Sequence, residues 1–389
     1  MLNHHILYNG NQVLVFGNNT YGQLGLGDNI YRDVPTLLMT NNQIVQIAVG
    51  KNHSIILEQN GNLYSFGCNN CGQLGLGDPL DRTVPTLLMT DNQISQIVCG
   101  SDYTFVYKSD GCLYSFGLNH RGQLGLGDKK NRYIPTLLMT NKNIAQIVCG
   151  CRHAAILINN GDLFTFGANY YGQLGMGDIV DRTMPTLLMT DPEISQIVCG
   201  INNTFILKRN GSLFAFGNNF SGQLGLDNLD NKHILAPRLL MIDREIKKII
   251  CKEGIISIFK SNNRLYSLDC VDTRPTLMIK NQETKQIFCR SGCTLVLKYD
   301  CKLFFFDKND DGDDDLFDNR EPILIDEKLV SINGIPVEKT IWHPEIYTAL
   351  SKPKKAQIKT FLSVCCYYRH HYKINMVKYM RHTIIGLLF

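Results

Sequence analysis

The sequence predicts an all-β fold, a seven-bladed β-propeller followed by a short α-helical C-terminal extension. Two observations predict the propeller: a repeat with a period of 50 residues, and strand-like runs within each repeat. A change of composition near residue 339 predicts the extension. The string GQLG marks the repeat, and it begins at Gly22, Gly72, Gly122, Gly172 and Gly222. Near-identical copies at such a period are typical of solenoids, propellers and arrays.

Each unit contains four short runs that favour strands. In residues 85–117 these runs are TLLMT, ISQIVCG, YTFVYK and CLYSFG, all rich in β-branched or aromatic residues and bounded by turn residues. Between the last two runs lies Asp110-Gly111, and Asn-Gly occupies the same place in other units. These pairs favour the two-residue turn of a β-hairpin, because both central residues need a positive φ. Four strands per unit fit one propeller blade.

Two weaker units follow the five clear ones. LYSLD at 265–269 and LFFFD at 303–307 match the closing strand, which gives seven closing strands. The first unit begins directly with ILYNGNQVLVFG, and residues 322–335 resemble the two strands that it lacks. We therefore expect strands near 322–335 to complete the first blade of a domain spanning residues 1–337. Such closure leaves no long open sheet edge.

The loop of each unit reads G-x-N-x-x-G-Q-L-G-x-G-D, as in FGNNTYGQLGLGD at 16–28 and FGLNHRGQLGLGD at 116–128. A second element is G-x-x-H, at Gly50–His53 and Gly150–His153. Together these motifs resemble the repeats of the RCC1 (regulator of chromosome condensation) superfamily, and the resemblance implies a seven-bladed β-propeller. WD40 repeats fit poorly because the chain has one Trp, and kelch repeats fit poorly because it has no Gly-Gly doublets.

Several chemically suggestive residues occupy repeat positions and have structural explanations. The G-x-x-H position holds His53, Tyr103, His153 and Asn203 in turn, a variation that favours packing and hydrogen bonding over catalysis. One cysteine position alternates with Val49 and is interpreted as a small apolar core site; it holds Cys99, Cys149, Cys199, Cys251 and Cys289. Cys68-x-x-Cys71 has the spacing of half a zinc site, but no second such pair exists.

An acidic run is the one candidate metal site. Its oxygen-bearing residues and Gly312 nearly follow the spacing of an EF-hand loop; the candidate calcium ligands are Asp307, Asn309, Asp311, Asp313, Asp315 and Asp318. Asp318 stands where an EF-hand has Glu, and a strand precedes the run. A degenerate, solvated loop of the seventh blade is the alternative. Calcium is thus the only cofactor that the sequence suggests.

Residues 338–389 form a basic tail. From Thr340 onward eight Lys or Arg face one acid, Glu345, so the tail carries +7 and the body before it −3 within the total of +4. Apolar spacing predicts helices over 356–368 and 377–388. The tail resembles a degenerate F-box-like module found on repeat proteins of large DNA viruses and some protists. That resemblance implies docking to a ubiquitin-ligase scaffold through Trp342, Pro344, Phe361, Leu362, Ile385 and Phe389. A structural helical cap, or nucleic-acid contact by the basic face, are the alternatives.

Partner specificity must come from positions that differ between the near-identical units. The candidate partner-binding residues are aromatic or cationic residues at variable loop positions, which are typical anchors of interfaces: Tyr21, His120, Arg121, Tyr170, Tyr171 and Phe220. No Ser-His-Asp, phosphate-loop, paired-carboxylate or dinucleotide motif is present.

We therefore expect a protein-interaction adaptor, more consistent with a non-enzyme than with an enzyme. The first alternative is guanine-nucleotide exchange on a Ran-like small GTPase, which the family resemblance implies. The early units, however, keep their 50-residue frame without an inserted hairpin. The second alternative is a chromatin-associated protein. The start of the chain has no secretory signal pattern and no run of about 18 apolar residues occurs, so we expect an intracellular protein, cytoplasmic or nuclear, without a membrane partner.

Overall fold

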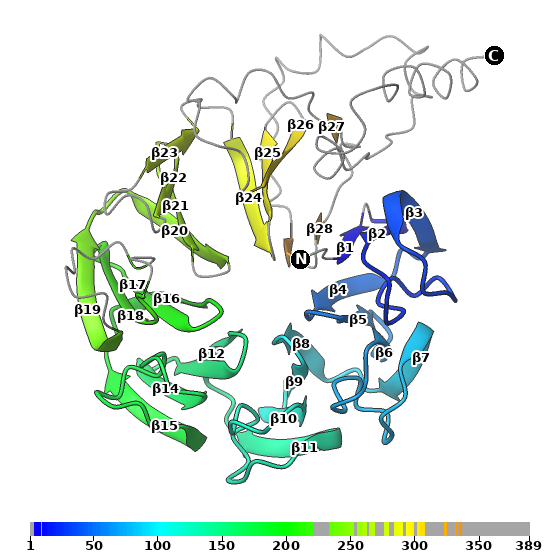
Figure 1. The fold of residues 1–389 in the computed structure, drawn as a ribbon, viewed down its shortest axis with the longest axis horizontal. Helices are drawn as coiled ribbons and strands as arrows, with labels where there is room; N and C mark the ends of the chain where they lie inside the picture. The colour runs from blue at the N-terminus through cyan, green and yellow to red at the C-terminus, as the bar shows by residue number, and fades with distance from the viewer. Residues whose placement is uncertain are drawn as a thin grey trace.

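The computed structural model shows an all-β architecture. It describes residues 4–8, 10–220, 224, 233–252, 255–262, 264–268, 276–279, 284–290, 293–298, 302–307, 323–324, 331–332 and 335–336. Within these residues all regular structure is β-strand, and the strands form seven antiparallel sheets, which we call sheets I to VII. The sheets follow one another around a common centre (Figure 1).

The first sheets contain the clearest repeats. Sheet I consists of β1 (His4–Tyr8), β2 (Gln12–Gly17) and β3 (Arg32–Thr40), with β28 (Ser331–Ile332) and β29 (Ile335–Pro336) beside β1. Sheet II consists of β4 (Ile44–Val49), β5 (His53–Glu58), β6 (Asn62–Gly67) and β7 (Arg82–Thr90). Sheet III consists of β8 (Ile94–Cys99), β9 (Tyr103–Lys108), β10 (Cys112–Gly117) and β11 (Arg132–Thr140). Sheet IV consists of β12 (Ile144–Cys149), β13 (His153–Ile158), β14 (Asp162–Gly167) and β15 (Arg182–Thr190).

The remaining sheets follow the same order. Sheet V consists of β16 (Ile194–Cys199), β17 (Asn203–Lys208), β18 (Ser212–Gly217) and β19 (Ile234–Ile242). Sheet VI consists of β20 (Ile246–Lys252), β21 (Ile255–Lys260), β22 (Leu265–Leu268) and β23 (Thr276–Ile279). Sheet VII consists of β24 (Thr284–Arg290), β25 (Cys293–Lys298), β26 (Lys302–Asp307) and β27 (Ile323–Leu324).

The pairing of strands corrects the phase of the repeat. The PTLLMT run, which the sequence analysis places at the start of a unit, is the outermost strand of the preceding sheet: β7 pairs with β6, with Leu63 opposite Met89. In the same way β27 pairs with β26, whereas Leu7 and Tyr8 of β1 pair with β28. Sheet I therefore has its own outer strand, β3, and the segment near 322–335 is divided between sheets VII and I. Closure of exactly these sheets into a complete seven-bladed ring, and the domain limits 1–337 and 338–389, stay predictions.

Neighbouring sheets are joined near the centre by a glutamine side chain. The Gln46 amide of β4 donates from Nε2 to the Ile97 carbonyl (2.8 Å) and accepts from the Ile97 N–H through Oε1 (2.9 Å). Gln146 makes the same pair of hydrogen bonds with Ile197, and Gln196 makes it with Ile249. A side-chain amide has one donor and one acceptor side, so it can substitute for a backbone partner between two strands that are not in one ladder. These bonds fix the register of the inner strands between sheets II and III, between sheets IV and V, and between sheets V and VI.

The glycine-rich loops of sheets I to IV each bind the following sheet through a backbone hydrogen bond. The Gly27 N–H donates to the Thr83 carbonyl of β7 (2.8 Å), and Gly77, Gly127 and Gly177 repeat this bond to the following sheet. Leu24 of the loop is fully buried and belongs to the same apolar cluster as Phe66 of sheet II. Burying apolar side chains between sheets contributes roughly 25 cal/mol per Å² of area removed from water. The repeated Gln-Leu pair therefore fills the space between blades.

Antiparallel pairing separates the connections onto two faces. The loop face, as we name it, carries the glycine-rich loops, such as residues 118–131, and the short turns that end at the G-x-x-H position. The hairpin face carries the Asn-Gly and Asp-Gly turns, such as 159–161, together with the links between sheets, such as 191–193.

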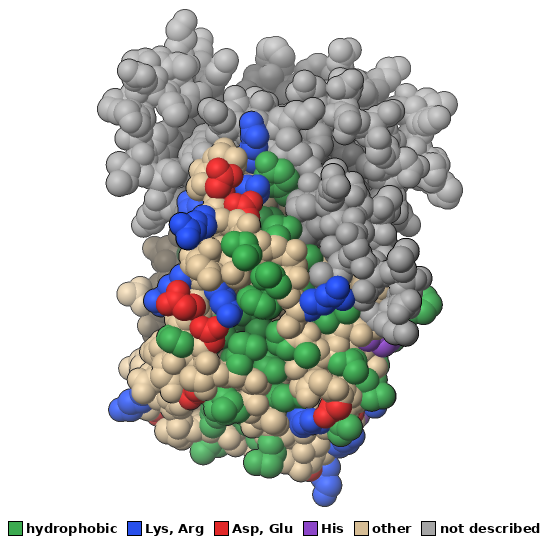
Figure 2. All heavy atoms as spheres, turned by 90° about the vertical axis from the view of Figure 1, so that its left-hand side faces the viewer, with side chains coloured by type: hydrophobic (Ala, Val, Ile, Leu, Met, Phe, Trp, Pro, Cys, Tyr) green, Lys and Arg blue, Asp and Glu red, His purple; other side chains and the backbone are tan. Residues whose placement is uncertain are grey.

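The outer strands expose apolar side chains around the rim. Figure 2 shows hydrophobic side chains scattered among charged ones on the side where β15 and β19 lie. The exposed side chains include two per outer strand in three successive sheets: Val84 and Leu87, Ile134 and Leu137, and Met184 and Leu187. Among the described residues, no helix is long and apolar enough to cross a membrane.

Candidate interaction surface on the loop face

A repeated hydrogen-bond network gives the loops of sheets I to IV the same backbone. In the loop of sheet III the Asn119 side chain accepts from Leu124 N–H (2.9 Å) and donates to the Asp128 carbonyl (3.0 Å). Asp128 in turn pairs with Arg132 at 2.7 Å. Hydrogen bonds from Arg132 and from the backbone lower the pKa of Asp128, so this carboxylate stays ionised at neutral pH. The rigid frame leaves the two residues after the Asn to vary, as at His120-Arg121.

Charged and aromatic side chains from sheets III, IV and V meet on this face. Arg121 Nη1 and Lys129 Nζ each lie 3.4 Å from Oδ2 of Asp181, which comes from the next loop. The other oxygen of Asp181 accepts from Asn169 N–H at 2.9 Å. Asp181 is only 11% exposed at its side chain whereas Arg121 is 41% exposed, so the carboxylate is fixed and the guanidinium reaches solvent.

Aromatic rings extend this cluster. The Arg121 guanidinium lies 5.2 Å from the centre of the Tyr170 ring, a cation–π contact. Tyr170 and Tyr171 are 4.5 Å apart in an edge arrangement, and Tyr171 lies 4.8 Å from His233 of sheet V. We call Arg121, Lys129, Tyr170, Tyr171 and Asp181 the loop cluster. Arg121 and the tyrosines are partly exposed, which suits a contact surface.

His120 stands beside the loop cluster. Partial burial, together with the positive charges of Arg152 and Arg121, lowers the pKa of His120, so its imidazole is neutral at pH 7. Arg152 comes from the turn that precedes His153, nearer the inner strands. The Asp102 carboxyl is also close to Arg152; burial raises its pKa, and Lys51 and Arg152 oppose this shift. The loop face therefore carries a cationic zone running from Arg121 toward the centre.

The structure brings some predicted partner-binding residues together and leaves others apart. Arg121, Tyr170 and Tyr171 are in contact, and His120 adjoins them. Tyr21 is 38% exposed on the loop of sheet I, and Phe220 is 68% exposed on the loop of sheet V. These two residues share the loop face and lie on other loops than the Arg121 and Tyr170 pair. That all six bind a partner stays a prediction.

The sequence analysis missed Lys129, Asp181 and His233 as members of this surface. Asp181 repeats Asp81 and Asn131, so its position looks like an ordinary loop residue. A signal did exist: the sheet III loop has cations at both 121 and 129, where the sheet II loop has Cys71 and Pro79. Arg121 and Lys129 flank one position of the next loop, and that loop places the Asp181 carboxylate between them.

The G-x-x-H position is buried and hydrogen-bonded. His53 Nε2 lies 3.0 Å from Thr104 Oγ1 of the next sheet, and His153 Nε2 lies 3.0 Å from Thr204 Oγ1. The Tyr103 hydroxyl donates to the His153 carbonyl at 2.6 Å. These contacts agree with a packing role and link each sheet to its neighbour.

The repeated cysteines are more exposed than the sequence analysis predicted when it interpreted their position as a core site. Cys99, Cys149, Cys199 and Cys251 are half-buried at the ends of the inner strands. Desolvation raises the pKa of Cys199 to about 12 and that of Cys68 to about 11, so both thiols are protonated at neutral pH. No group of three or more His, Cys, Asp or Glu residues suited to a metal ion occurs within the described part of the chain.

Two predicted sites fall beyond the described residues. Asp307 ends β26, but the other candidate calcium ligands, from Asn309 to Asp318, lie outside the described residues. The candidate docking residues of the tail, from Trp342 to Phe389, and its predicted helices also lie outside them. Calcium binding and the F-box-like tail stay predictions.

The fold and the loop face define a class of protein, the repeat β-propeller. Its loops are hydrogen-bonded to the next sheet, and they present variable side chains on a repeated backbone conformation. Within that class, the model of the RCC1-like domain family matches residues 3–258, and the chain belongs to this family. The described sheets and the repeat motifs agree with that membership.

Solved structures show the same fold at low identity. Yeast RCC1 (Prp20), in a structure with Kap60, is 20% identical, with a TM-score of 0.66 over 79% of this chain and 78% of that chain. A structure of Prp20p from Saccharomyces cerevisiae, which also concerns its binding to Gsp1p and histones, is 20% identical with a TM-score of 0.66, covering 79% and 81%. Human WBSCR16 is 19% identical with a TM-score of 0.63, covering 74% and 82%. No curated protein sequence matches the chain.

Proposed function

We propose that this protein is a non-enzymatic interaction propeller that binds a protein partner through its loop face. The observation that supports this function is the loop cluster, in which a half-exposed arginine and two tyrosines stand on a rigid, repeated backbone. Tyrosine and arginine carry much of the binding energy in protein interfaces, and rigid placement reduces the entropy lost on binding. The buried Asp181 holds Arg121 in place, so the cluster is pre-organised.

The test compares proteins that copurify with the full chain and with a double variant, Arg121→Ala with Tyr170→Ala. We expect the specific partners of the wild type to be depleted at least about tenfold, since removal of a hot-spot side chain costs about 2 kcal/mol or more. Arg244→Ala, at an exposed position of the hairpin face, is the matched control and should retain them. Equal recovery with the double variant would contradict the use of the loop cluster.

Guanine-nucleotide exchange on a Ran-like GTPase is the second candidate. It is supported by the family and by the Prp20p structure that concerns binding to Gsp1p. The test is GDP release from Ran and related GTPases with the purified chain. Acceleration well above the spontaneous rate, lost in the Arg121→Ala, Tyr170→Ala variant, would establish exchange. Release at the spontaneous rate would leave the non-enzymatic adaptor. A chromatin role, the third candidate, predicts histone capture that is sensitive to salt.

The adaptor proposal includes the tail. If residues 338–389 dock to a ubiquitin-ligase scaffold, a chain ending at residue 337 should keep its loop-face partner and lose the scaffold. Substituting Trp342→Ala with Phe361→Ala in the full chain should have the same effect. Retention of the scaffold by both variants would reduce the tail to a structural or nucleic-acid-binding segment.

A further inference from the structure

Lysine side chains occupy an equivalent place on the hairpin face of sheets III, V and VI. Lys208, at the end of β17, places Nζ 2.7 Å from Oδ2 of Asp191 and 4.6 Å from the centre of the Phe214 ring. Lys108 in sheet III and Lys260 in sheet VI repeat both contacts, to Asp91 and Tyr114 and to Asp243 and Tyr266 respectively. In each of these three sheets the lysine ammonium lies over the ring of the equivalent aromatic residue.

Sheet IV lacks the lysine. Its equivalent residue is Ile158, which is buried, and the residue equivalent to Asp191 is Asn141. Sheet II also lacks the lysine, but Glu58 there accepts hydrogen bonds from Asn41 (2.5 Å) and Asn62 (3.1 Å). At this position sheets II, III, V and VI have Glu58, Lys108, Lys208 and Lys260. Among sheets II to VI, only sheet IV has an apolar residue, Ile158, in place of a long polar side chain.

The missing side chain leaves space. A cavity of about 440 Å³ opens beside Ile158, lined by Phe164, Asp162 and amide side chains that include Asn141 and Asn143. Phe164 is half-buried and equivalent to Phe214 and Tyr114 of the sister sheets, so its ring belongs to the cavity wall. Within the described residues, no cation is recorded over this ring.

Asp162 supplies negative charge at the same cavity. It accepts hydrogen bonds from Thr190 (2.6 Å) and Asn160 (2.7 Å), which lower its pKa and keep it ionised at neutral pH. The equivalent residues of sheets II, III and V are Asn62, Cys112 and Ser212, so among sheets II to V only sheet IV has a carboxylate at this position. No lysine or arginine pairs with Asp162 in the part of the chain that the structure describes.

We propose that sheet IV binds a lysine side chain of a partner polypeptide in this cavity, its ammonium group facing the Phe164 ring and the Asp162 carboxylate. Sheets III, V and VI supply that cation from within the chain, and sheet IV takes it from outside. Attraction between a cation and an aromatic face, strengthened by a nearby carboxylate, favours the ammonium over a neutral side chain of equal length.

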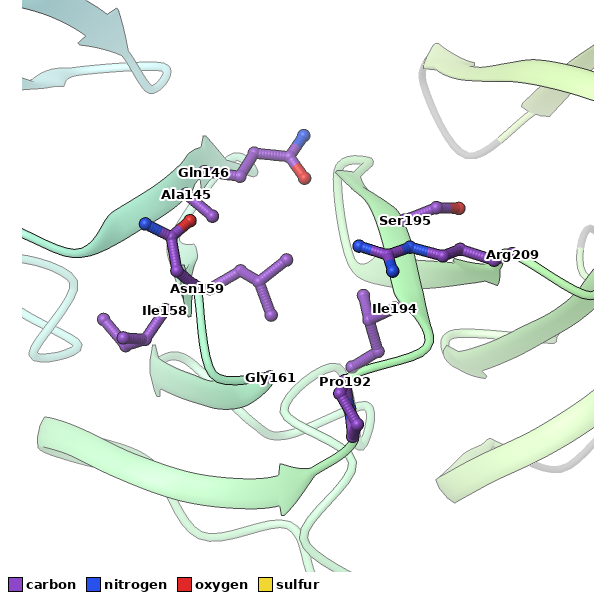
Figure 3. Close-up of a pocket in the computed structure, with 10 residues that line it drawn as sticks. Ala145, Gln146, Ile158, Asn159, Gly161, Pro192, Ile194, Ser195 and Arg209 are labelled. Carbon is purple, nitrogen blue, oxygen red and sulfur yellow. The ribbon is translucent and has the colours of Figure 1, made fainter.

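A second cavity of about 330 Å³ shares Ile158 and Asn159 with the first and gives the partner chain room to continue. Figure 3 shows it between the end of β13 and β16, with Pro192, Ile194 and the Arg209 side chain on one side and Asn159 on the other. Arg209 is exposed and has no recorded acidic partner among the described residues. A partner with an acidic residue near its lysine therefore suits the pair of cavities.

The test uses saturation-transfer NMR with the full chain and the peptide acetyl-Gly-Lys-Gly-Asp-Gly-amide at millimolar concentration. We expect saturation of the lysine ε-methylene protons, and weaker transfer to a peptide with norleucine in place of lysine. Ile158→Lys should abolish binding, because the new lysine fills the cavity as Lys108 and Lys208 fill theirs. Asp162→Asn should weaken binding by about two- to fivefold, as expected for loss of one exposed charge partner.

Both substitutions copy residues already present in other sheets, so we expect both variants to fold. Because Ile158 is buried in an apolar cluster, Ile158→Lys should melt at a lower temperature than Asp162→Asn. Asp110→Asn is the matched control: it removes one negative charge from the same face, and Asn60 and Asn210 occupy its position elsewhere. This control should bind the peptide as the wild type does.

Undiminished binding by Ile158→Lys, equal binding of the norleucine peptide, or no binding by the wild type would each overturn the proposal. The loop-face variant, Arg121→Ala with Tyr170→Ala, should retain peptide binding. Failure of this site is therefore distinguishable from failure of the loop-face function.

Discussion

At the scale of single residues, two glycines at different positions of the repeated GQLGLGD loop differ in the space around them. Gly125 and Gly177 both adopt a left-handed backbone, with φ of 74° and 83°. A Cβ at Gly125 would lie 2.9 Å from Leu138 Cδ1 and 3.0 Å from Phe166, whereas a Cβ at Gly177 would meet nothing within 4 Å. Both glycines adopt a positive φ that disfavours other residues. Of the two, only Gly125 has neighbours so close that an added methyl group would clash with them.

We therefore predict that Gly125→Ala destabilises the protein more than Gly177→Ala. The left-handed conformation costs alanine about 1 kcal/mol at either site. Overpacking against Leu138 and Phe166 adds roughly 1–3 kcal/mol at Gly125. Urea unfolding of the two variants measures the difference, and equal losses would show that the loop relaxes around the added methyl group.

His153 makes stability depend on pH. It is fully buried, and burial lowers its pKa from 6.5 to about 4. Between these pH values the unfolded chain binds a proton that the folded chain does not, so stability falls as pH decreases through this window. The contribution is about 3 kcal/mol, since one pKa unit corresponds to about 1.4 kcal/mol.

We predict that His153→Asn, which copies Asn203 of the next sheet, reduces the loss of stability between pH 6.5 and 4. Denaturant unfolding of both proteins across this range measures it, and the carboxylates common to both cancel in the comparison. Parallel pH profiles would mean that His153 accepts a proton as readily in the folded protein as in the unfolded chain.

At the scale of elements, the glutamines of β4, β12 and β16 join sheets that share no ladder. Removing the Gln146 amide leaves the N–H and C=O groups of Ile197 without partners at a junction between sheets IV and V. An unsatisfied buried polar group costs about 1–3 kcal/mol. The same side chain also lines the smaller cavity of the hairpin face.

Gln146→Leu should therefore lower the free energy of unfolding by about 2–4 kcal/mol, with both groups of Ile197 affected. Gln93→Leu, at an exposed position in a link between sheets, is the control and should change it little. The measurement is equilibrium unfolding in urea. A loss no greater than that of the control would show that water replaces the amide.

At the scale of the whole molecule, the ends of the propeller meet in sheet I. β28 pairs with β1 through Leu7 opposite Ile332 and Tyr8 opposite Ser331, and Leu7 and Tyr8 are buried. Without β28, one edge of β1 would lose its partner strand, and unpaired edges favour aggregation.

We predict that a chain ending at residue 337 keeps the melting temperature of the full protein, whereas one ending at residue 322 melts several degrees lower and aggregates more readily. Thermal unfolding with light scattering checks both. Equal melting of the two shortened chains would show that closure through β28 contributes nothing to stability.

Much of this architecture could be predicted from the sequence because its signals are local. The Asn-Gly turns and the alternating apolar runs identified strands and hairpins, and the repeat identified blades. The assignment of PTLLMT to a sheet could not be read this way, because its partner is chosen by hydrogen-bond register and packing. The half-buried state of Cys149 likewise depends on how closely the inner strands approach.

The sequence by itself determined the repeat, the all-β class and the variable loop positions, since these follow from residue type and spacing. Only the tertiary structure decided which distant side chains meet: Arg121 lies beside Asp181, sixty residues later in the chain, and Phe164 lies beside Ile158 where Tyr114 and Phe214 face a lysine. The physical reason is that strand propensity is a property of each segment. A binding surface is instead made by the register between segments, which forms only when the blades pack.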